Sequence, residues 1–211
     1  MGRNYVSNTV DGQIAVITGG TRGIGRAIAE SLLAAGASVA ITGRDARKAD
    51  DLVERWGPTG RFLVIQADMS TKDGVEKSFD KTEERFGPVN IAVLNAGGVD
   101  KSTPIAVMTD EEWEFELNLN LNHTFWGMRR ALRSMIPHKA GRIIAVSSIE
   151  GKHGKANVAG YTANKHAING LVKAAAREVG KDGIGIMSIC PGIVQIDRKS
   201  TRLNSSHLKL S

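Results

Sequence analysis

Three residues in the second half of the chain could together act on a carbonyl group. Ser148 precedes Tyr161 by thirteen residues, and Lys165 follows Tyr161 by four. Residues four apart on a helix share a face, so the phenol and the ammonium can point into one cleft. A hydroxyl group facing this pair could polarise a carbonyl, which the phenol could then protonate. Because a Tyr-x-x-x-Lys pair is also common on helix surfaces, this interpretation depends on the elements that carry the three residues.

The spacing of apolar residues predicts the elements that position this chemistry. Short apolar runs predict six buried strands, at residues 14–18, 39–42, 62–66, 91–94, 142–147 and 185–189. Helical patterns lie between them, one ending at residue 35 and the others at 45–56, 71–86, 110–136 and 159–180. This alternation predicts an α/β fold, a Rossmann-like doubly wound parallel sheet in a three-layer arrangement. Right-handed crossovers bring all the strand carboxyl ends to one edge, where Ser148 would lie.

A glycine-rich turn follows the first predicted strand and opens the first helix. Glycines let the backbone approach a pyrophosphate, and the N-terminus of a helix favours negative charge. The turn therefore predicts a dinucleotide site, and the alternative is a tight strand-to-helix turn without a ligand. Its candidate cofactor-binding residues are Gly19, Thr21, Arg22, Gly23, Ile24 and Gly25.

Two arginines near this turn favour NADP over NAD. An NAD site usually has a carboxylate at the end of the second strand, where it binds the ribose 2′-hydroxyl. Here no acid precedes Asp45 at that position, which reads Thr42-Gly43-Arg44. Arg22 and Arg44 could hold a 2′-phosphate in charge-assisted hydrogen bonds. NAD stays possible if Arg44 only faces solvent.

Composition narrows the classes of function. The 211 residues carry a net charge of +6, half of it in the last fifteen residues, and no base-stacking motif accompanies it, so no nucleic-acid partner is expected. No apolar run approaches the roughly 20 residues of a membrane span, and the N-terminus lacks the apolar core of a signal peptide. The single cysteine, Cys190, fits a reducing, cytoplasmic location. Five scattered histidines give no metal-binding spacing, so no metal is expected.

The order of these motifs resembles the short-chain dehydrogenase/reductase family in its single-domain form. The resemblance covers residues 13–196 and implies a reductase or dehydrogenase that uses NAD(P). It is carried by the glycine turn of residues 18–25, Asp68, the Asn-Ala-Gly-Gly sequence of residues 95–98, Asn120, Ser148, Tyr161, Lys165 and Pro191-Gly192.

The resemblance also implies which residues bind the cofactor. Asp68, beside Met69, would bind the adenine amino group. The loop of Asn95, Ala96 and Gly97 would lie behind the adenosine ribose. The nicotinamide would be held by Pro191, Gly192, Ile193 and Val194.

Four residues are the expected catalytic set: Asn120, Ser148, Tyr161 and Lys165. Asn118, Asn120 and Asn122 compete for the asparagine role, and counting seven residues on from Trp113, as the family pattern does, selects Asn120.

The residue types explain how this set would work. A free tyrosine has a pKa of about 10, and a neighbouring ammonium favours the phenolate, so Lys165 is expected to lower the pKa of Tyr161. The family resemblance implies that Lys165 would also bind the nicotinamide ribose and that Asn120 would hold a water that links Lys165 to solvent. Ser148 would donate to the substrate oxygen, and Tyr161 would act as the general acid.

The substrate is expected to be a small carbonyl compound or alcohol. Lys152, His153 and Lys155 form a basic loop that could attract a phosphate-bearing thioester, or could simply be solvated. Reduction of a 3-oxoacyl thioester is the first expectation, with oxidation of a secondary alcohol, sugar or steroid as the alternative. The competing functions are a non-enzymatic dinucleotide-binding sensor and an inactive truncated fragment. The full-length protein is expected to be a homodimer or homotetramer.

The two ends of the chain are expected to lie outside the domain. Residues 1–12 read as a flexible polar arm, ahead of a single domain at 13–196. After Ile196 the family normally continues with a substrate-covering segment, a helix and a last strand, which the sequence does not predict here. Residues 197–207 match the translation of a common sequencing adapter, so 197–211 is interpreted as a non-native tail on a C-terminally truncated domain.

Overall fold

The computed structural model of the chain describes residues 10–194. The expected arm and tail lie largely or wholly outside these residues, and the proposed domain boundaries stay predictions. Among the described residues, no helix is both long and apolar enough to cross a membrane.

Six parallel strands form one sheet in the order β3-β2-β1-β4-β5-β6. The strands are β1 Ile14–Ile17, β2 Ser38–Gly43, β3 Phe62–Gln66, β4 Ile91–Leu94, β5 Gly141–Val146 and β6 Ile184–Ile189. Two of the predicted strands, at 62–66 and 91–94, have the predicted bounds, and the others differ by one residue at one or both ends. The strand order reverses between β1 and β4, which is where open α/β sheets bind ligands. The predicted doubly wound parallel sheet is confirmed.

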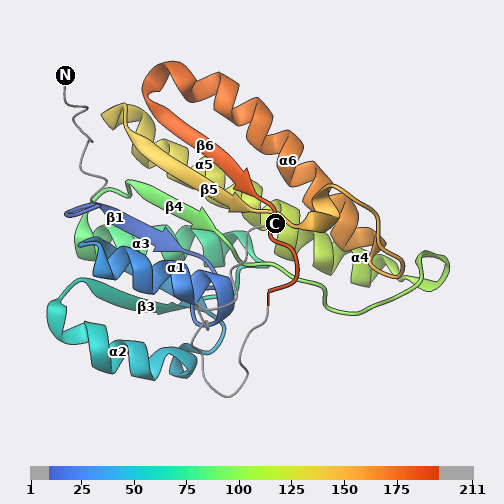
Figure 1. Ribbon diagram of the computed structural model, residues 1–211, viewed down its shortest axis with the longest axis horizontal. Helices are drawn as coiled ribbons and strands as arrows, with labels where there is room; N and C mark the ends of the chain where they lie inside the picture. The colour runs from blue at the N-terminus through green and yellow to red at the C-terminus, as the bar shows by residue number, and fades with distance from the viewer. Residues whose placement is uncertain (1–9, 195–211) are drawn as a thin grey trace, which may run out of the picture.

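Helices cover both faces of the sheet (Figure 1). They are α1 Gly23–Ala34, α2 Asp50–Trp56, α3 Lys72–Phe86, α4 Asp110–Leu117, α5 His123–Met135 and α6 Ala159–Val179. One core cluster joins side chains of α3, α5 and α6 to the sheet, and a second joins those of α1 and α2. Figure 1 shows α4 close to the start of α6, near the edge at which the strands end.

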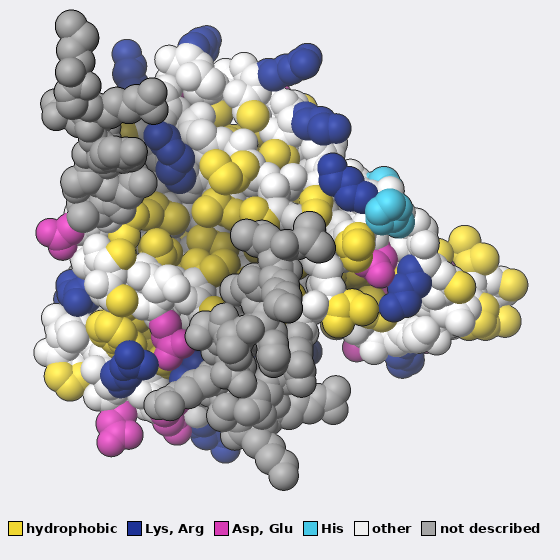
Figure 2. Space-filling view, viewed as in Figure 1, with side chains coloured by type: hydrophobic (Ala, Val, Ile, Leu, Met, Phe, Trp, Pro, Cys, Tyr) yellow, Lys and Arg dark blue, Asp and Glu magenta, His cyan; other side chains and the backbone are white. Residues whose placement is uncertain are grey.

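The core cluster that includes α1 and α2 leaves the β5 and β6 end of its sheet face partly exposed. On the face that carries α1 and α2, Ile144 of β5 is only partly buried, and Met187, which pairs with it from β6, is 49% exposed. Figure 2 shows apolar side chains gathered on this side of the molecule.

Local signals explain several element boundaries. The Thr71 hydroxyl accepts a hydrogen bond from Gly74 N at 3.0 Å and caps α3, as the sequence predicts. A Thr109–Glu112 capping box starts α4. The helix predicted from residue 45 begins with a 3₁₀ turn at Ala46–Ala49, whose cap is Asp45.

The prediction of one continuous helix over residues 110–136 is wrong. A π-helical turn at Asn118–Asn122 separates α4 from α5. A π turn inserts one residue into the helix and rotates the side chains that follow, a feature often found at functional sites. The turn contains Asn120, one of the expected catalytic residues.

Candidate active site

The glycine turn is tied to the loop that follows β4. Asn95 Nδ2 donates to the carbonyls of Thr18, at 2.9 Å, and Gly19, at 3.0 Å. The Thr18 hydroxyl in turn accepts from the backbone nitrogens of Asn95, at 2.9 Å, and Ala96, at 3.1 Å. A Cβ at Gly25 would lie 2.5 Å from Asn95 Nδ2, so this packing requires glycine. The two loops therefore form one rigid unit at the point where the strand order reverses.

The start of α1 is open to an anion. Its N-cap residue, Arg22, makes no side-chain capping hydrogen bond, and the first turn contains no acidic residue. Gly19 and Gly23 have φ values of +65° and +58°, which glycine adopts without the strain that a Cβ would cause. The backbone N–H groups at the start of α1 can therefore face a phosphate group without competition from a capping side chain.

The end of β2 presents a cation and no free acid. Arg44 and Arg22 are both exposed, and neither forms an ion pair within the part of the chain that the structure describes. The carboxylate of Asp45 is bound by Arg47, with Nε 2.9 Å from Oδ1. This arrangement suits a phosphate better than a ribose hydroxyl.

Two residues of the loop after β3 were expected to bind the cofactor, Asp68 and Met69, and only the side chain of Asp68 is exposed. The exposed carboxylate of Asp68 accepts hydrogen bonds from the backbone nitrogen and the hydroxyl of Ser70, both at 2.9 Å. The side chain of Met69 is 4% exposed and belongs to the core, with the Ser78 hydroxyl 3.9 Å from its sulfur. Only the backbone of Met69 could therefore face a cofactor.

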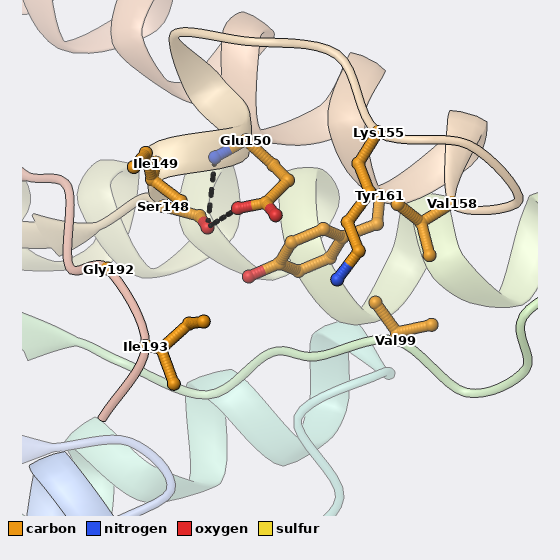
Figure 3. Close-up of a pocket in the computed structure, with 9 residues that line it drawn as sticks. All are labelled: Val99, Ser148, Ile149, Glu150, Lys155, Val158, Tyr161, Gly192 and Ile193. Carbon is orange, nitrogen blue, oxygen red and sulfur yellow. Dashed lines mark hydrogen bonds between the residues drawn. The ribbon is translucent and has the colours of Figure 1, made fainter. Parts of the chain in front are cut away.

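Ser148 and Tyr161 meet in a cleft of about 240 Å³ (Figure 3). Ser148 follows β5, and Tyr161 projects from the first turn of α6. Figure 3 shows the phenol oxygen directed towards the Ser148 hydroxyl. Gly192 and Ile193, from the segment after β6, line the same cleft, and Pro191 O accepts from Ile149 N at 2.9 Å. The segment expected to hold nicotinamide thus faces the expected catalytic residues.

Lys165 lies beneath the cleft and is 3% exposed. Its Nζ donates to the carbonyl of Val146 at 2.8 Å and lies 5.3 Å from the centroid of the Tyr161 ring. Burial lowers the pKa of Lys165 to about 8. The four-residue spacing therefore places the two side chains together, as predicted.

The expected lowering of the Tyr161 pKa is wrong. Burial raises the pKa of the phenol above 10.0, and the negative charges of Glu150 and Glu116 raise it further, against the lowering effect of the Ser148 hydrogen bond. The loss of solvent around the buried phenol disfavours the phenolate, and the spacing of Tyr161 and Lys165 alone does not reveal this burial.

Of the three competing asparagines, only Asn120 faces the site. It is fully buried, its Oδ1 accepts from Gly98 N at 3.0 Å, and its Nδ2 donates to the carbonyls of Gly98 and Glu116 at 3.0 and 2.9 Å. A Cβ placed at Gly97 would lie 2.7 Å from Asn120 Oδ1 and 3.2 Å from Lys165 Nζ, so both groups flank the same glycine. Asn118 and Asn122 instead bond each other at 2.7 Å.

Several residues of the site were not predicted. Glu150 accepts a hydrogen bond from Ser148 at 2.9 Å, and its position two residues after Ser148 was the one available signal. Lys155, from the predicted basic loop, lines the cleft, while Lys152 and His153 do not. The remaining lining side chains are apolar: Val99, Ile149 and Val158.

His123 is a buried histidine beside this site. Its Nε2 lies 2.9 Å from the Thr18 hydroxyl, and its Nδ1 has no hydrogen-bond partner among residues 10–194. Burial, together with the charge of Lys165, lowers the pKa of His123 to about 3. The ring is therefore neutral at physiological pH and packs beneath the loop that joins β1 to α1.

Every residue expected at the site is described, and all lie at the carboxyl edge of the sheet or on α6 and the π turn beside it. Within residues 10–194, no group of three or more His, Cys, Asp and Glu side chains could hold a metal ion. The arrangement can bind an anionic nucleotide at the glycine turn and hold a carbonyl oxygen between a hydroxyl and a phenol.

Comparison with known proteins places the chain in a family. A sequence model described as short chain dehydrogenase matches residues 13–206, which extends past the predicted boundary at Ile196. A 3beta-hydroxysteroid dehydrogenase of Mediterraneibacter gnavus is 35% identical over 208 residues, 97% of this chain and 74% of the relative. A 3-oxoacyl-[acyl-carrier-protein] reductase of Salmonella typhimurium is 35% identical over 187 residues, 89% of this chain and 75% of the relative.

Two further proteins that are similar to this chain are also dehydrogenases. An NADP-dependent (R)-specific alcohol dehydrogenase of Lentilactobacillus kefiri is 37% identical over 193 residues, 90% of this chain and 76% of the relative. The crystal structure of a short-chain dehydrogenase from Streptomyces avermitilis superimposes with a TM-score of 0.82 at 28% identity. That match covers 87% of this chain and 66% of the other. The expected class, an oxidoreductase acting on CH–OH and C=O groups, is confirmed at the level of the family, and the chain belongs to the short-chain dehydrogenase/reductase family.

Proposed function

We propose that the protein is an NADP-dependent oxidoreductase that interconverts a ketone and a secondary alcohol by hydride transfer. The observation that carries the proposal is the meeting of Ser148 and Tyr161 in one cleft, with Lys165 and Asn120 directly behind them. A protein that only sensed a dinucleotide would need none of these four side chains. Their presence together therefore favours an enzyme over a dinucleotide sensor.

The residues around the glycine turn fit the proposed cofactor. Gly25 packs so closely against Asn95 that no side chain is tolerated, and the uncapped start of α1 leaves backbone N–H groups for a pyrophosphate. Exposed Arg44, with Asp45 already bound to Arg47, supports a 2′-phosphate and hence NADP. When bound, the nicotinamide supplies or accepts the hydride.

Each catalytic side chain has a separate task in this proposal. Ser148 donates a hydrogen bond to the carbonyl oxygen as negative charge develops there. Tyr161 gives that oxygen its proton, and its raised pKa keeps the phenol protonated at neutral pH, the form that a general acid requires. Lys165 is charged at neutral pH because its pKa is about 8, so it can bind a ribose hydroxyl with the protons not used by Val146.

Asn120 holds the backbone around this site. Its amide makes two hydrogen bonds with Gly98 and so fixes the loop after β4 beside Lys165. We propose that it also supports a water that connects Lys165 to solvent. The loop and the lysine then keep one spacing during turnover.

Two substrate classes fit the cleft. A 3-oxoacyl thioester is the first, supported by Lys155 at the rim, which could contact a phosphate of the carrier group. A hydroxysteroid or other bulky secondary alcohol is the second, supported by the apolar side chains of Val99, Ile149 and Val158. The names of the relatives include both classes.

The quaternary state and location are part of the proposal. A homodimer or homotetramer would cover the exposed aromatic side chains of Trp113 on α4 and Phe125 on α5. Size-exclusion chromatography with light scattering would measure the mass. The single cysteine supports a reducing cytoplasmic location.

Turnover of a carbonyl panel tests the proposed function. The full chain is mixed with NADPH and, separately, a 3-oxoacyl thioester, a 3-ketosteroid and simple ketones, and NADPH absorbance is followed. Tyr161→Phe is the matched control, because it removes only the proton donor and should lower turnover by about 10²- to 10⁴-fold. A wild-type chain that binds NADPH but reduces none of the panel, or a Tyr161→Phe variant with wild-type rates, contradicts the proposal.

A further inference from the structure

A buried carboxyl group lies near the site but has no part in the reaction described above. Glu116 is on α4, is 3% exposed, and its Oε2 has no hydrogen-bond partner among residues 10–194. Burial raises the pKa of Glu116, and the charges of Asp100 and Glu112 act in the same direction. Burying a carboxyl group is unfavourable unless something nearby compensates for the lost water.

Backbone N–H groups of the catalytic helix and of the loop after β4 act against this effect of burial. The N–H groups of Asp100 and Tyr161 stabilise the carboxylate and lower its pKa, in opposition to burial. Glu116 Oε2 also lies against Gly160, where a Cβ would be only 2.5 Å from it. The carboxyl group of Glu116 is therefore packed on the first turn of α6.

This turn of α6 needs an acceptor from elsewhere. The first N–H groups of a helix have no partner within the helix, and a side chain at the N-cap usually accepts from one of them. The N-cap of α6 is Val158, which cannot, and it makes no side-chain capping hydrogen bond. The carboxyl group of Glu116, packed against Gly160 from a different helix, is placed to supply this acceptor.

The packing of Glu116 against Gly160 connects it to two residues of the site, Tyr161 and Asn120. Tyr161 directly follows Gly160, and Figure 3 shows its phenol directed into the cleft. Asn120 lies one turn after Glu116 and donates to the Glu116 carbonyl at 2.9 Å. A shift of the Glu116 carboxyl group would therefore move the start of α6 relative to the asparagine.

We propose that Glu116 is a positioning residue that caps the first turn of α6 from α4 and so fixes the phenol of Tyr161 in the cleft. Its carboxylate also acts on the phenol through charge, because it is one of the groups that raise the pKa of Tyr161. Other charged groups face these two residues and stay unchanged in the test. They are Lys165 on α6, Glu150 and Lys155 beside the cleft, and Asp100 and Glu112 beside Glu116.

Direct titration of the phenol tests the electrostatic part of this proposal without any turnover. The chain has two tyrosines, Tyr5 and Tyr161, so the ultraviolet absorbance of tyrosinate in a Tyr5→Phe background reports on Tyr161 alone. Glu116→Gln keeps the shape and one acceptor but removes the charge, so the pKa of Tyr161 should fall. Glu114→Gln, an exposed acid on the same helix, is the matched control and should leave it unchanged. Equal titration curves for Glu116→Gln and its parent overturn the proposal.

Kinetics test the positioning part, which rests on the proposed function. Glu116→Leu removes the acceptor and should lower kcat by about 10- to 100-fold, the effect of a small misplacement of a catalytic group. The Kd for NADPH should stay the same, which also shows that the variant folds. Glu116→Gln should keep most of the wild-type kcat. A Glu116→Leu variant that keeps the wild-type kcat overturns the proposal.

A second substitution covers the case in which Glu116→Leu does not fold. Gly160→Ala places a Cβ against Glu116 Oε2 and should lower kcat, whereas in a Glu116→Ala background the space is free and the same change should have little effect. Equal effects in both backgrounds overturn the proposal. If the wild-type chain reduces no substrate, the proposed function fails, but the titration of Tyr161 still tests the role of Glu116.

Discussion

The hydroxyl of Ser148 donates a hydrogen bond to Glu150 Oε2 at 2.9 Å, and the backbone nitrogen of Glu150 donates one to the same hydroxyl at 3.2 Å. Both side chains line the cleft that holds Tyr161 (Figure 3). A serine hydroxyl has one proton, so a carbonyl oxygen must compete with the carboxylate of Glu150 for it. Glu150 is therefore expected to reduce the reactivity of Ser148 towards a neutral carbonyl.

Glu150→Ala should raise kcat/KM for a neutral ketone, because Ser148 would then be free to donate to the substrate. A hydrogen bond to a charged group contributes about 1.5–3 kcal/mol, so a gain of roughly ten-fold or more is expected. Steady-state kinetics with NADPH measure it. The control is the same change in a Ser148→Ala background, where the gain should vanish. An equal gain in both backgrounds would mean that Glu150 acts by another route.

Arg44→Ala should weaken binding of NADPH and spare NADH, because only NADPH carries the 2′-phosphate. The lost charge-assisted bond is worth about 1.5–3 kcal/mol, or roughly ten-fold or more in Kd. Fluorescence titration with both cofactors measures the difference. Lys48→Ala is the control on the following 3₁₀ turn, because Lys48 is an exposed cation outside the proposed phosphate site and its loss leaves the Arg47–Asp45 pair intact. Equal losses for the two cofactors in Arg44→Ala would remove the support for NADP.

Gly25→Ala should destabilise the protein and should weaken the binding of NADPH and of NADH to the same extent. The added Cβ would lie 2.5 Å from Asn95 Nδ2 and 2.6 Å from Gly19 O, so the turn and the loop after β4 must separate. Overpacking of this kind costs about 1–3 kcal/mol. Urea unfolding measures the loss. Gly170→Ala is the control, because no atom lies within 4 Å of its Cβ position on α6, and alanine should there stabilise the helix. A Gly25→Ala variant as stable as wild type would contradict the packing argument.

Acid should destabilise the protein through His123. Its folded pKa is about 3, below the ordinary value of 6.5, so between these values the unfolded chain binds a proton that the folded chain does not. The free energy of unfolding should therefore fall by about 1.4 kcal/mol for each pH unit from 6.5 towards 3 through this residue. His123→Asn should remove that part of the slope, measured by urea unfolding from pH 7 to pH 4. His166→Asn, at an exposed position, is the control and should keep the wild-type slope. An unchanged slope in His123→Asn would contradict the assignment.

The sequence by itself determined the sheet, and it predicted most of the residues that the structure brings together at the candidate site. Short apolar runs predicted all six strands because strands buried on both faces admit little polar sequence. The glycine turn, Ser148 and the four-residue spacing of Tyr161 and Lys165 were predictable because each depends on local backbone geometry. Parallel topology then required them to meet at one edge.

Only the tertiary structure decided how these groups act on one another. Asn120, in the π turn, is hydrogen-bonded to the distant loop at Gly98, and the pKa of Tyr161 depends on burial and on charges from other elements. Glu116 is an ordinary helical glutamate in the sequence and becomes a cap for α6 only when two helices pack. Such contacts join residues far apart in the chain, and their energies depend on solvent exclusion and distance, which the order of residues does not record.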